Sequence, residues 1–286
     1  MNTHLRGILI TALGVLLITP DSLFVRLIEA EPLAVAFWRG LGSGLVILLG
    51  VLAFMGPRAI VRSMNTGRPG LIYMVLIGAT TPGFVMAVTQ TSVANVVFIF
   101  ASMPVFAAIF ARVFLGERIS RRMVLTMLVV MAGLGIIAAG SHENEIASWK
   151  GDIWALFVSA AYAAALTAVR QLRDISMVPA IPVAYIGGAL AMLPFTTPLS
   201  ALPEFWPLIL GHGIFIALGT CFLTLGPRYI SSAEVSLLIL LESVLAPLLV
   251  WAIVGEDPGR WAIVGGAVVI SALVVSNLMA LRRRRV

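Results

Sequence analysis

ANVVFIFASMPVFAAIFARVFLGERISR, residues 94–121, and AEVSLLILLESVLAPLLVWAIVGEDPGR, residues 233–260, are the two stretches that decide the fold. Each has an apolar run of roughly 20 residues, enough to cross about 30 Å of hydrocarbon as a helix, and then a short polar segment. Identical pairs at an offset of 139 residues (233 minus 94) include Ala94 and Ala233, Val96 and Val235, Gly116 and Gly255, Glu117 and Glu256, and Arg121 and Arg260. The chain therefore contains an internal repeat built around a membrane span.

The composition of the whole chain is that of an integral membrane protein. Of its 286 residues, 60% are hydrophobic and 11% are charged, whereas soluble domains are about 25% charged. The apolar runs are continuous and show no strict alternation, which favours helices over a β-barrel. Ten spans are predicted, at residues 7–28, 32–54, 70–89, 93–115, 121–140, 151–171, 179–197, 207–226, 233–254 and 260–281.

Ten spans divide evenly between the two copies of the repeat. The predicted division is an N-terminal repeat at 1–140, a periplasmic connector at 141–150 and a C-terminal repeat at 151–286. Because five is an odd number, the second copy crosses the membrane in the opposite direction. Inverted repeats of this kind are a transporter architecture with the substrate held near the midplane. The expected fold is all-α, with ten transmembrane helices in two inverted five-helix repeats around a central cavity.

The basic residues predict the orientation of the chain. With the N-terminus in the cytoplasm, the threading places 15 of the 19 basic residues on the cytoplasmic side, including the tail Arg282–Arg285. This excess follows the positive-inside rule. Both termini are therefore expected in the cytoplasm. The tail is expected to anchor the topology and to touch anionic lipid.

Motifs at the ends of the fourth and ninth spans carry a family resemblance. FLGERIS after the fourth span, IVGEDPG after the ninth, and PLAVAFWRGLGSGL in the second resemble the drug/metabolite transporter superfamily, EamA type. The first span departs from the family pattern, with ITPDSLF where many members carry a Trp-rich stretch. The resemblance covers nearly the whole chain and implies a transporter. Overall likeness suggests the bacterial amino-acid exporter branch, which implies a location in the bacterial inner membrane.

Asp21 and Arg39 lie inside predicted spans, where a charge costs about 2.5–3.5 kcal/mol on insertion scales. Each is about seven residues from the outer end of its span, so both lie about 10 Å below the outer surface. The connecting loop is short, and an Asp21–Arg39 ion pair between neighbouring helices is predicted. The pair either clamps two helices together or opens with an outer gate; alternatively, Arg39 meets a substrate carboxylate.

Glu242 lies near the midplane of the ninth span. Its repeat mate is Met103, between Ser102 and Pro104, and Pro247 follows in its own span. A proline inside a helix frees a backbone carbonyl, which in a membrane needs a neighbour, water or a ligand. Glu242 is therefore a candidate for gripping a substrate ammonium or for carrying a proton. The alternative is a protonated side chain hydrogen-bonded to another helix, with the prolines as static kinks.

Further polar residues are candidates for the cavity wall or a gate. Gln90, Tyr162 and Tyr229 are candidate lining residues, although aromatic residues near span ends are usually interface anchors. Asn95 is a candidate helix cap or gate residue. His212, expected near the outer boundary of the eighth span, is interpreted as structural. Spans three, four, eight and nine are expected to line the cavity.

The sequence argues against an enzyme. No G-x-x-x-x-G-K-[ST] motif is present, and Lys150 is the sole lysine, so the chain cannot hydrolyse ATP through a P-loop. One cysteine and three histidines argue against a metal cluster, and no cofactor is expected. The predicted function is export of small metabolites, foremost amino acids with aromatic or apolar side chains, by alternating access. Proton antiport and facilitated diffusion both fit, and a drug carrier of the same fold or a channel is the alternative.

Overall fold

A computed structural model describes residues 3–116, 118–140, 147–172, 175–225, 229–230 and 232–284. Glu117 and most of the predicted connector, residues 141–146, lie outside the described residues. Within these ranges every regular element is a helix. The prediction of an all-α protein is confirmed.

The longer helices follow the predicted spans closely. They are α1 (Thr3–Ile18), α2 (Asp21–Leu27), α3 (Pro32–Phe54), α4 (Pro57–Met64), α5 (Gly67–Gln90), α6 (Val93–Phe100), α7 (Met103–Leu115), α8 (Arg121–Gly140), α9 (Trp149–Val169), α10 (Ile181–Met192), α11 (Leu202–Leu225), α12 (Ser232–Val254) and α13 (Arg260–Arg284). Short 3-10 turns are η1 (Arg170–Leu172), η2 (Val178–Ala180), η3 (Leu193–Phe195) and η4 (Pro198–Ala201). In the described ranges, nine helices or joined helix pairs are long and apolar enough to cross a membrane, and the apolar part of α12, Leu238–Val254, is a shorter tenth.

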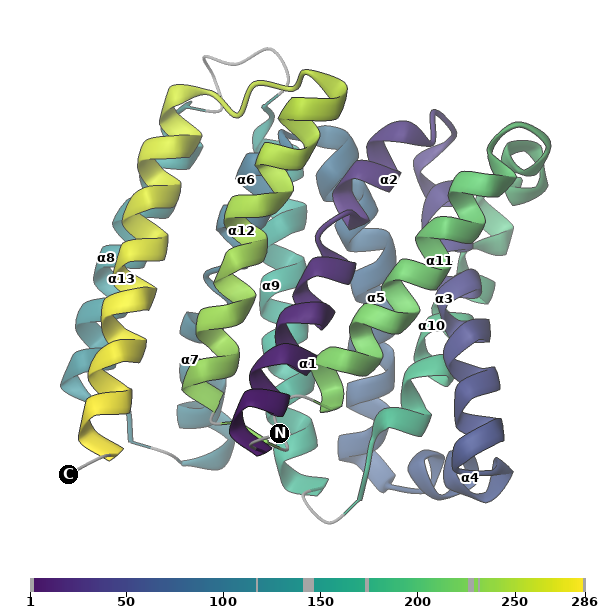
Figure 1. Ribbon diagram of the computed structural model, residues 1–286, viewed down its shortest axis with the longest axis horizontal. Helices are drawn as coiled ribbons and strands as arrows, with labels where there is room; N and C mark the ends of the chain where they lie inside the picture. Colours follow the sequence, from purple (N-terminus) through teal and green to yellow (C-terminus); the bar gives the residue numbers. More distant parts are fainter. Residues whose placement is uncertain are drawn as a thin grey trace.

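The two repeated stretches run in opposite directions through the bundle (Figure 1). Both termini lie at one end, called here the termini end; the opposite end is called the far end. The pair α6–α7 runs from the far end to the termini end, whereas α12 runs from the termini end to the far end. This is the inversion expected from five spans per repeat.

Two predicted spans are interrupted, and proline explains both breaks. Pro20 has no N–H to donate to the turn before it, so α1 ends and α2 starts at Asp21. The fourth span breaks between α6 and α7 at Ala101–Ser102, with Pro104 in the first turn of α7. In contrast, α12 continues as one helix through Pro247. The two repeats therefore differ at their prolines, and the predicted bend at Pro247 is not a helix break.

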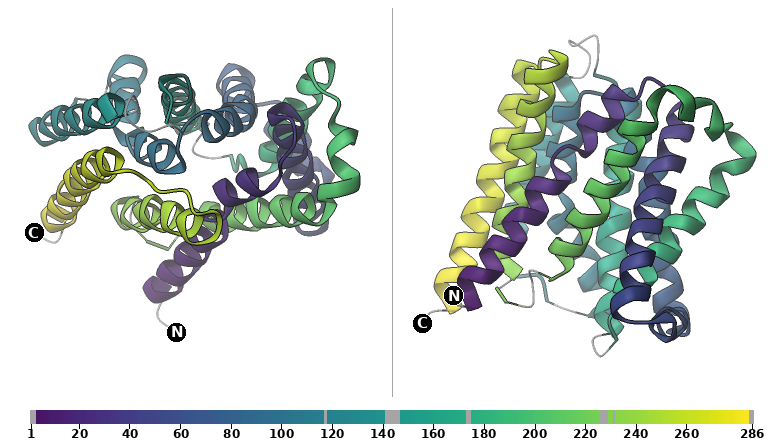
Figure 2. Two further views of the ribbon diagram at one scale, coloured as in Figure 1. Left: turned by 90° about the horizontal axis from the view of Figure 1, so that it is seen from above. Right: turned by 45° about the vertical axis from the view of Figure 1, so that its right-hand side comes forward.

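Close glycine contacts bring pairs of long helices together. A Cβ on Gly188 of α10 would lie 2.8 Å from the carbonyl oxygen of Gly78 in α5. A Cβ on Gly265 of α13 would lie 2.7 Å from the carbonyl oxygen of Gly133 in α8. In lipid, small residues allow such backbone approach, and packing replaces the missing hydrophobic force. The pair α8–α13 stands at one edge of the bundle (Figure 2).

Candidate functional site

A cavity of about 370 Å³ lies between the two repeats. Its walls come from α1, α5, α7, α9, α10, α11 and α12, and they are mainly apolar. Polar groups on the wall include the hydroxyls of Tyr73, Tyr162, Tyr185, Thr220 and Thr224. An apolar cavity with a few polar groups is the usual form of a small-molecule site. More helices line it than the predicted spans three, four, eight and nine, because α1, α9 and α10 also contribute.

The cavity extends to the termini end of the bundle. Its wall includes Val169, the last residue of α9, and Thr224, next to the end of α11. Met177 and Val178, in the connection between α9 and α10, also line it. These elements all end at the termini end, so the cavity occupies that half of the bundle.

Asp21 is the centre of a buried charge cluster. Arg39 donates to both carboxylate oxygens, with Nε 2.9 Å from Oδ1 and Nη2 2.5 Å from Oδ2. His212 Nε2 lies 2.7 Å from Oδ1, and Arg39 Nη1 donates to Thr81 Oγ1 at 3.3 Å. The two-pronged geometry is the strongest form of arginine–carboxylate pairing. The predicted Asp21–Arg39 ion pair is present in the structure.

Burial explains how such a cluster is held inside an apolar bundle. Asp21, Arg39 and His212 are 5%, 9% and 1% exposed. They come from α2, α3 and α11, so the cluster joins three helices. Phe24 stacks on the His212 ring with centroids 5.2 Å apart, and Arg39 lies 5.1 Å from the centroid of Phe84. The cluster is flanked by the rings of Phe24 and Phe84, and both carboxylate oxygens of Asp21 have partners within it.

The predicted position of His212, near the outer boundary of the eighth span, is wrong. The eighth span was predicted to begin at residue 207, which put His212 near the outer boundary. In the structure α11 begins at Leu202 and His212 is ten residues further along the helix, at the depth of Asp21. Pro203 and Pro207 obscure the start of α11 at Leu202 in the sequence, although proline is tolerated in the first turn of a helix.

Glu242 is a partly buried acid on α12, one of the helices that line the cavity. Val235 and Ile239 line the cavity, and Glu242 follows them at helical spacing on the same face of α12. Asp21 and Arg39 are close enough for their charges to act on it. No donor in the described part of the chain hydrogen-bonds to its carboxylate, and the side chain is only partly buried. Glu242 therefore offers a carboxylate with unused acceptor capacity beside the cavity.

The far end of the bundle is closed by a second polar network, called here the far-end latch. Arg26 Nε lies 2.7 Å from Glu256 Oε2, and Arg26 Nη2 donates to the carbonyl oxygen of Thr91 at 2.9 Å. Thr91 Oγ1 donates to Asp152 Oδ1 at 2.9 Å, and Asn95 Nδ2 lies 3.1 Å from the same oxygen. Glu256 and Asp152 belong to the second repeat and the other three to the first. The latch ties the repeats together at the end opposite to the cavity.

Glu256 also caps a helix of the opposite repeat. Its Oε1 accepts from the backbone N–H of Val93 at 2.6 Å, at the start of α6. A carboxylate is favoured there because the first N–H groups of a helix have no partner within it. Glu256 is 8% exposed, so its two oxygens are both engaged in a dry environment.

Comparison with known proteins identifies the family of this chain. The sequence model of the EamA-like transporter family matches residues 5–139 and again 149–278. The chain belongs to the EamA-like transporter family. It is a multi-pass membrane transporter with a small-molecule substrate, as the family resemblance implied, and the family is one of transporters, not of enzymes. The amino-acid exporter branch is not supported by any named relative.

Structural comparison supports the fold of this EamA protein. A solved crystal structure, described only as that of a protein, aligns with a TM-score of 0.68 over 97% of this chain and 98% of that chain, at 16% identity. At this identity the likeness shows the fold alone. No curated protein matches the sequence.

The other predicted site residues of the EamA chain divide into two groups. Tyr162 and Met103, the repeat mate of Glu242, line the cavity. Ser102 is buried at the break before α7, with Oγ 3.4 Å from Ser159 Oγ. Pro104 and Pro247 are on α7 and α12, the two helices related by the repeat.

Three predicted residues lie away from the cavity. Asn95 is in the far-end latch; the cap of α6 is Ser92, whose side chain accepts from the Asn95 backbone N–H. Gln90 is at the far end of α5, with its Nε2 4.0 Å from Met86 Sδ. Tyr229 is exposed at the termini end, where Arg6 lies 5.5 Å from the centroid of its ring. Gln90 and Tyr229 are therefore not part of the cavity wall.

Proposed function

We propose that this EamA transporter exports small metabolites, with amino acids bearing apolar or aromatic side chains as the preferred class. The observation that carries the proposal is Glu242, a carboxylate without a protein donor in the described residues, beside a largely apolar cavity. The substrate ammonium would pair with Glu242. The apolar side chain would contact the aromatic faces of Tyr73, Tyr162 and Tyr185.

Of the roles considered from sequence, this proposal assigns Arg39 the helix clamp and not the contact with a substrate carboxylate. Its guanidinium is engaged by both oxygens of Asp21 and by Thr81. A direct bond from Arg39 to a substrate carboxylate would have to break that pair, which is costly for a buried charge. Arg39 is therefore assigned to holding α2, α3 and α11 in register.

The transport cycle follows from the position of the cavity and of the far-end latch. With the protein in a bacterial inner membrane and the termini end in the cytoplasm, the cavity faces the cytoplasm and the latch closes the outer side. Export then requires the repeats to rock so that the latch opens and the termini end closes. The break between α6 and α7 supports this movement, because a helix in two segments can bend with little loss of hydrogen bonding.

The direct test is uptake into proteoliposomes that contain the purified protein. We expect saturable uptake and counterflow of apolar amino acids, and a loss of at least about tenfold in Glu242→Gln, which removes the charge that pairs with an ammonium. The control is Glu204→Gln, because Glu204 is an exposed acid at the start of α11. Unchanged transport and selectivity in Glu242→Gln would refute the site. Repeating the assay with and without a pH gradient separates proton antiport from facilitated diffusion.

A carrier of lipophilic organic cations is the second candidate. An unpartnered carboxylate among aromatic side chains suits a cation without a carboxylate as well as it suits an amino acid. The same vesicles loaded with a lipophilic amine distinguish the two, since a drug carrier would exchange the amine and not the amino acids. A channel would conduct without saturation or counterflow.

A further inference from the structure

We propose that a groove between α8 and α13 binds one anionic glycerophospholipid, with an acyl chain along the groove and the phosphate on Arg122. The groove encloses about 580 Å³ and is lined by the termini-side halves of both helices, from Arg122 to Val129 and from Ala267 to Met279. This site is separate from the cavity, and the proposal does not depend on the transported substrate.

The shape of the groove follows from the packing of the two helices. Towards the far end, Gly133 and Gly265 bring the backbones into contact, and Gly140 lies against Trp261. The groove is lined by the helix segments between these contacts and the termini end. No glycine is among the residues that line it. Its length along α13, from Ala267 to Met279, is about 18 Å at 1.5 Å per residue. This is close to the depth of one leaflet, about 15 Å of hydrocarbon.

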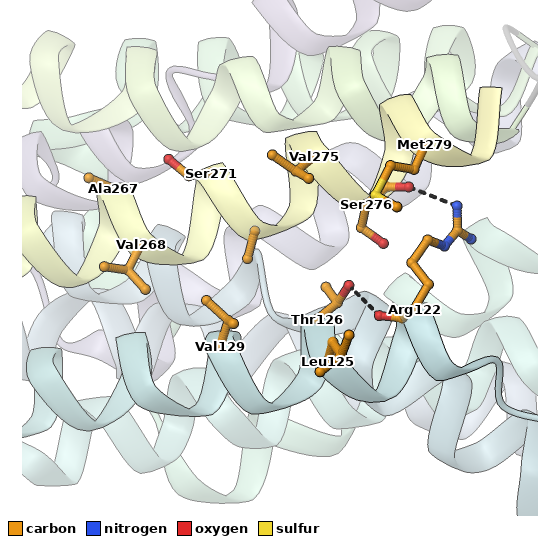
Figure 3. A pocket seen from close by; sticks show the side chains of 11 residues that line it. Arg122, Leu125, Thr126, Val129, Ala267, Val268, Ser271, Val275, Ser276 and Met279 are labelled. Atoms are coloured by element: carbon orange, nitrogen blue, oxygen red, sulfur yellow. Dashed lines mark hydrogen bonds between the residues drawn. The ribbon is translucent and has the colours of Figure 1, made fainter. Parts of the chain in front are cut away.

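The wall of the groove is apolar and its side chains are exposed at the edge of the bundle. Leu125, Val129, Val275 and Met279 are 64%, 45%, 56% and 44% exposed. In a bilayer these side chains face hydrocarbon, so an acyl chain and not water is the natural occupant. Figure 3 shows the side chains along the two facing helices, with Arg122 at one end of the row.

The charge at the mouth of the groove specifies the headgroup. Arg122 Nη1 donates to the carbonyl oxygen of Ser276 at 2.8 Å (Figure 3), which fixes the guanidinium beside the groove and leaves further N–H donors for a phosphate. Neither α8 nor α13 contains an acidic residue. By sequence, Arg121 starts α8 and Arg282–Arg284 end α13 at this same end. A basic site between helices at the membrane surface is typical of anionic-lipid binding.

A second groove provides the comparison within the same molecule. It lies between α5 and α10, encloses about 510 Å³ and has an entirely apolar or small-residue wall that includes Ala79, Val183 and Ala191. No charged residue lines it. The two grooves are similar in size, so a preference for anionic lipid is expected only between α8 and α13.

The test is native mass spectrometry of the detergent-purified protein with added phosphatidylglycerol or phosphatidylcholine. We expect one phosphatidylglycerol per chain, retained at least about fivefold better than phosphatidylcholine, since one arginine at a membrane surface contributes roughly this factor. Arg122→Gln should remove the preference. Ala267→Phe, which fills the groove and keeps the arginine, should remove the bound lipid.

Matched variants and probes make the result decisive. Arg62→Gln removes an exposed arginine of α4, and Ala191→Phe fills the second groove; both should leave binding unchanged. Glycerol phosphate, which has the phosphate and no acyl chain, should not bind. The proposal would be overturned if Arg122→Gln and Arg62→Gln lost phosphatidylglycerol equally, or if the protein retained the two lipids equally. It would also be overturned if the groove proved to be a dimer contact that Ala267→Phe dissociates. Elution of every variant as a single size-exclusion peak shows that it is folded.

Discussion

Asp21 shows how one side chain can tie several helices together inside a membrane. It accepts from Arg39 and contacts His212, and the three residues belong to three helices. A buried ion pair adds little net stability compared with apolar residues of similar volume, but removing one partner leaves an uncompensated charge. Single and double substitutions are therefore expected to differ in their effects.

Asp21→Asn should destabilise the protein more than the double substitution Asp21→Asn with Arg39→Gln. The single change leaves the Arg39 cation buried without its counter-charge, at a cost of about 3–5 kcal/mol, whereas the double change removes both charges. Thermal unfolding of the purified protein in detergent measures the order of stability. Arg62→Gln is the control for loss of an exposed arginine. If the double variant were less stable than both Asp21→Asn and Arg39→Gln alone, the idea that this ion pair clamps the helices together would be contradicted.

At the scale of elements, the far-end latch and the glycine contacts set how the helices move and pack. The latch joins α2, the α5–α6 connection, α9 and the α12–α13 connection. Its residues belong to both repeats, so opening the far end must break it. The glycine contacts, in contrast, lie within pairs of helices and are expected to persist through the cycle.

Breaking the latch should expose the cavity to the outer side. The measurement is labelling of Thr220→Cys, on the cavity wall, by a membrane-impermeant thiol reagent in a chain whose sole cysteine, Cys221, is serine. Arg26→Gln and Glu256→Gln should each raise labelling from the outside several-fold, because each leaves a charge unpaired in the closed state. The double variant Arg26→Gln with Glu256→Gln should raise labelling by less than the two single effects combined, because both residues belong to the same ion pair. No change in either single variant would show that the latch does not close the outer side.

Gly188→Leu should disrupt the packing of α5 on α10, while Gly187→Leu should be tolerated. A Cβ on Gly188 would lie 2.8 Å from a backbone oxygen of Gly78, but a Cβ on Gly187 meets nothing within 4 Å. Overpacking costs about 1–3 kcal/mol or more where backbone must move. The yield of monodisperse protein and its melting temperature report the difference. Equal effects of the two neighbours would show that the helices do not approach there.

For the whole molecule, the inverted repeat and the distribution of charge together define the orientation. Both termini lie at the same end of the bundle (Figure 1). The basic residues concentrate at that end, so the proposed orientation places it in the cytoplasm. Lys150, the sole lysine, is exposed at the start of α9, next to the far-end latch.

Lys150 therefore reports the orientation of the intact protein. A membrane-impermeant amine reagent applied to whole cells should label the protein once, at Lys150, because the proposed orientation puts the N-terminal amine on the cytoplasmic side. Lys150→Arg should abolish the labelling in cells and leave the labelling of the N-terminal amine after lysis. Labelling of Lys150→Arg in intact cells would place the termini outside and reverse the proposed direction of the cavity.

Sequence alone determined the class, the number of spans, their bounds to within a few residues, the inversion and the Asp21–Arg39 pair. These follow from local quantities: the length of apolar runs, the offset between repeats, and depth counted at a fixed rise per residue. The exceptions at element scale are α4, an added amphipathic helix, the start of α11 at Leu202, and the breaks at Pro20 and Ala101–Ser102. They depend on a local competition between proline and the helix that hydropathy does not resolve.

Only the tertiary structure decided which polar side chains meet. His212 completes the Asp21 cluster, and Arg26 pairs with Glu256 more than 200 residues away in sequence. Such partners are set by the rotation of each helix about its axis and by the choice of neighbours, which contacts between distant segments determine. The same contacts leave Glu242 beside the cavity and place Gln90 and Tyr229 away from it. In a membrane, hydropathy fixes which segments span the bilayer, while packing fixes what each helix faces.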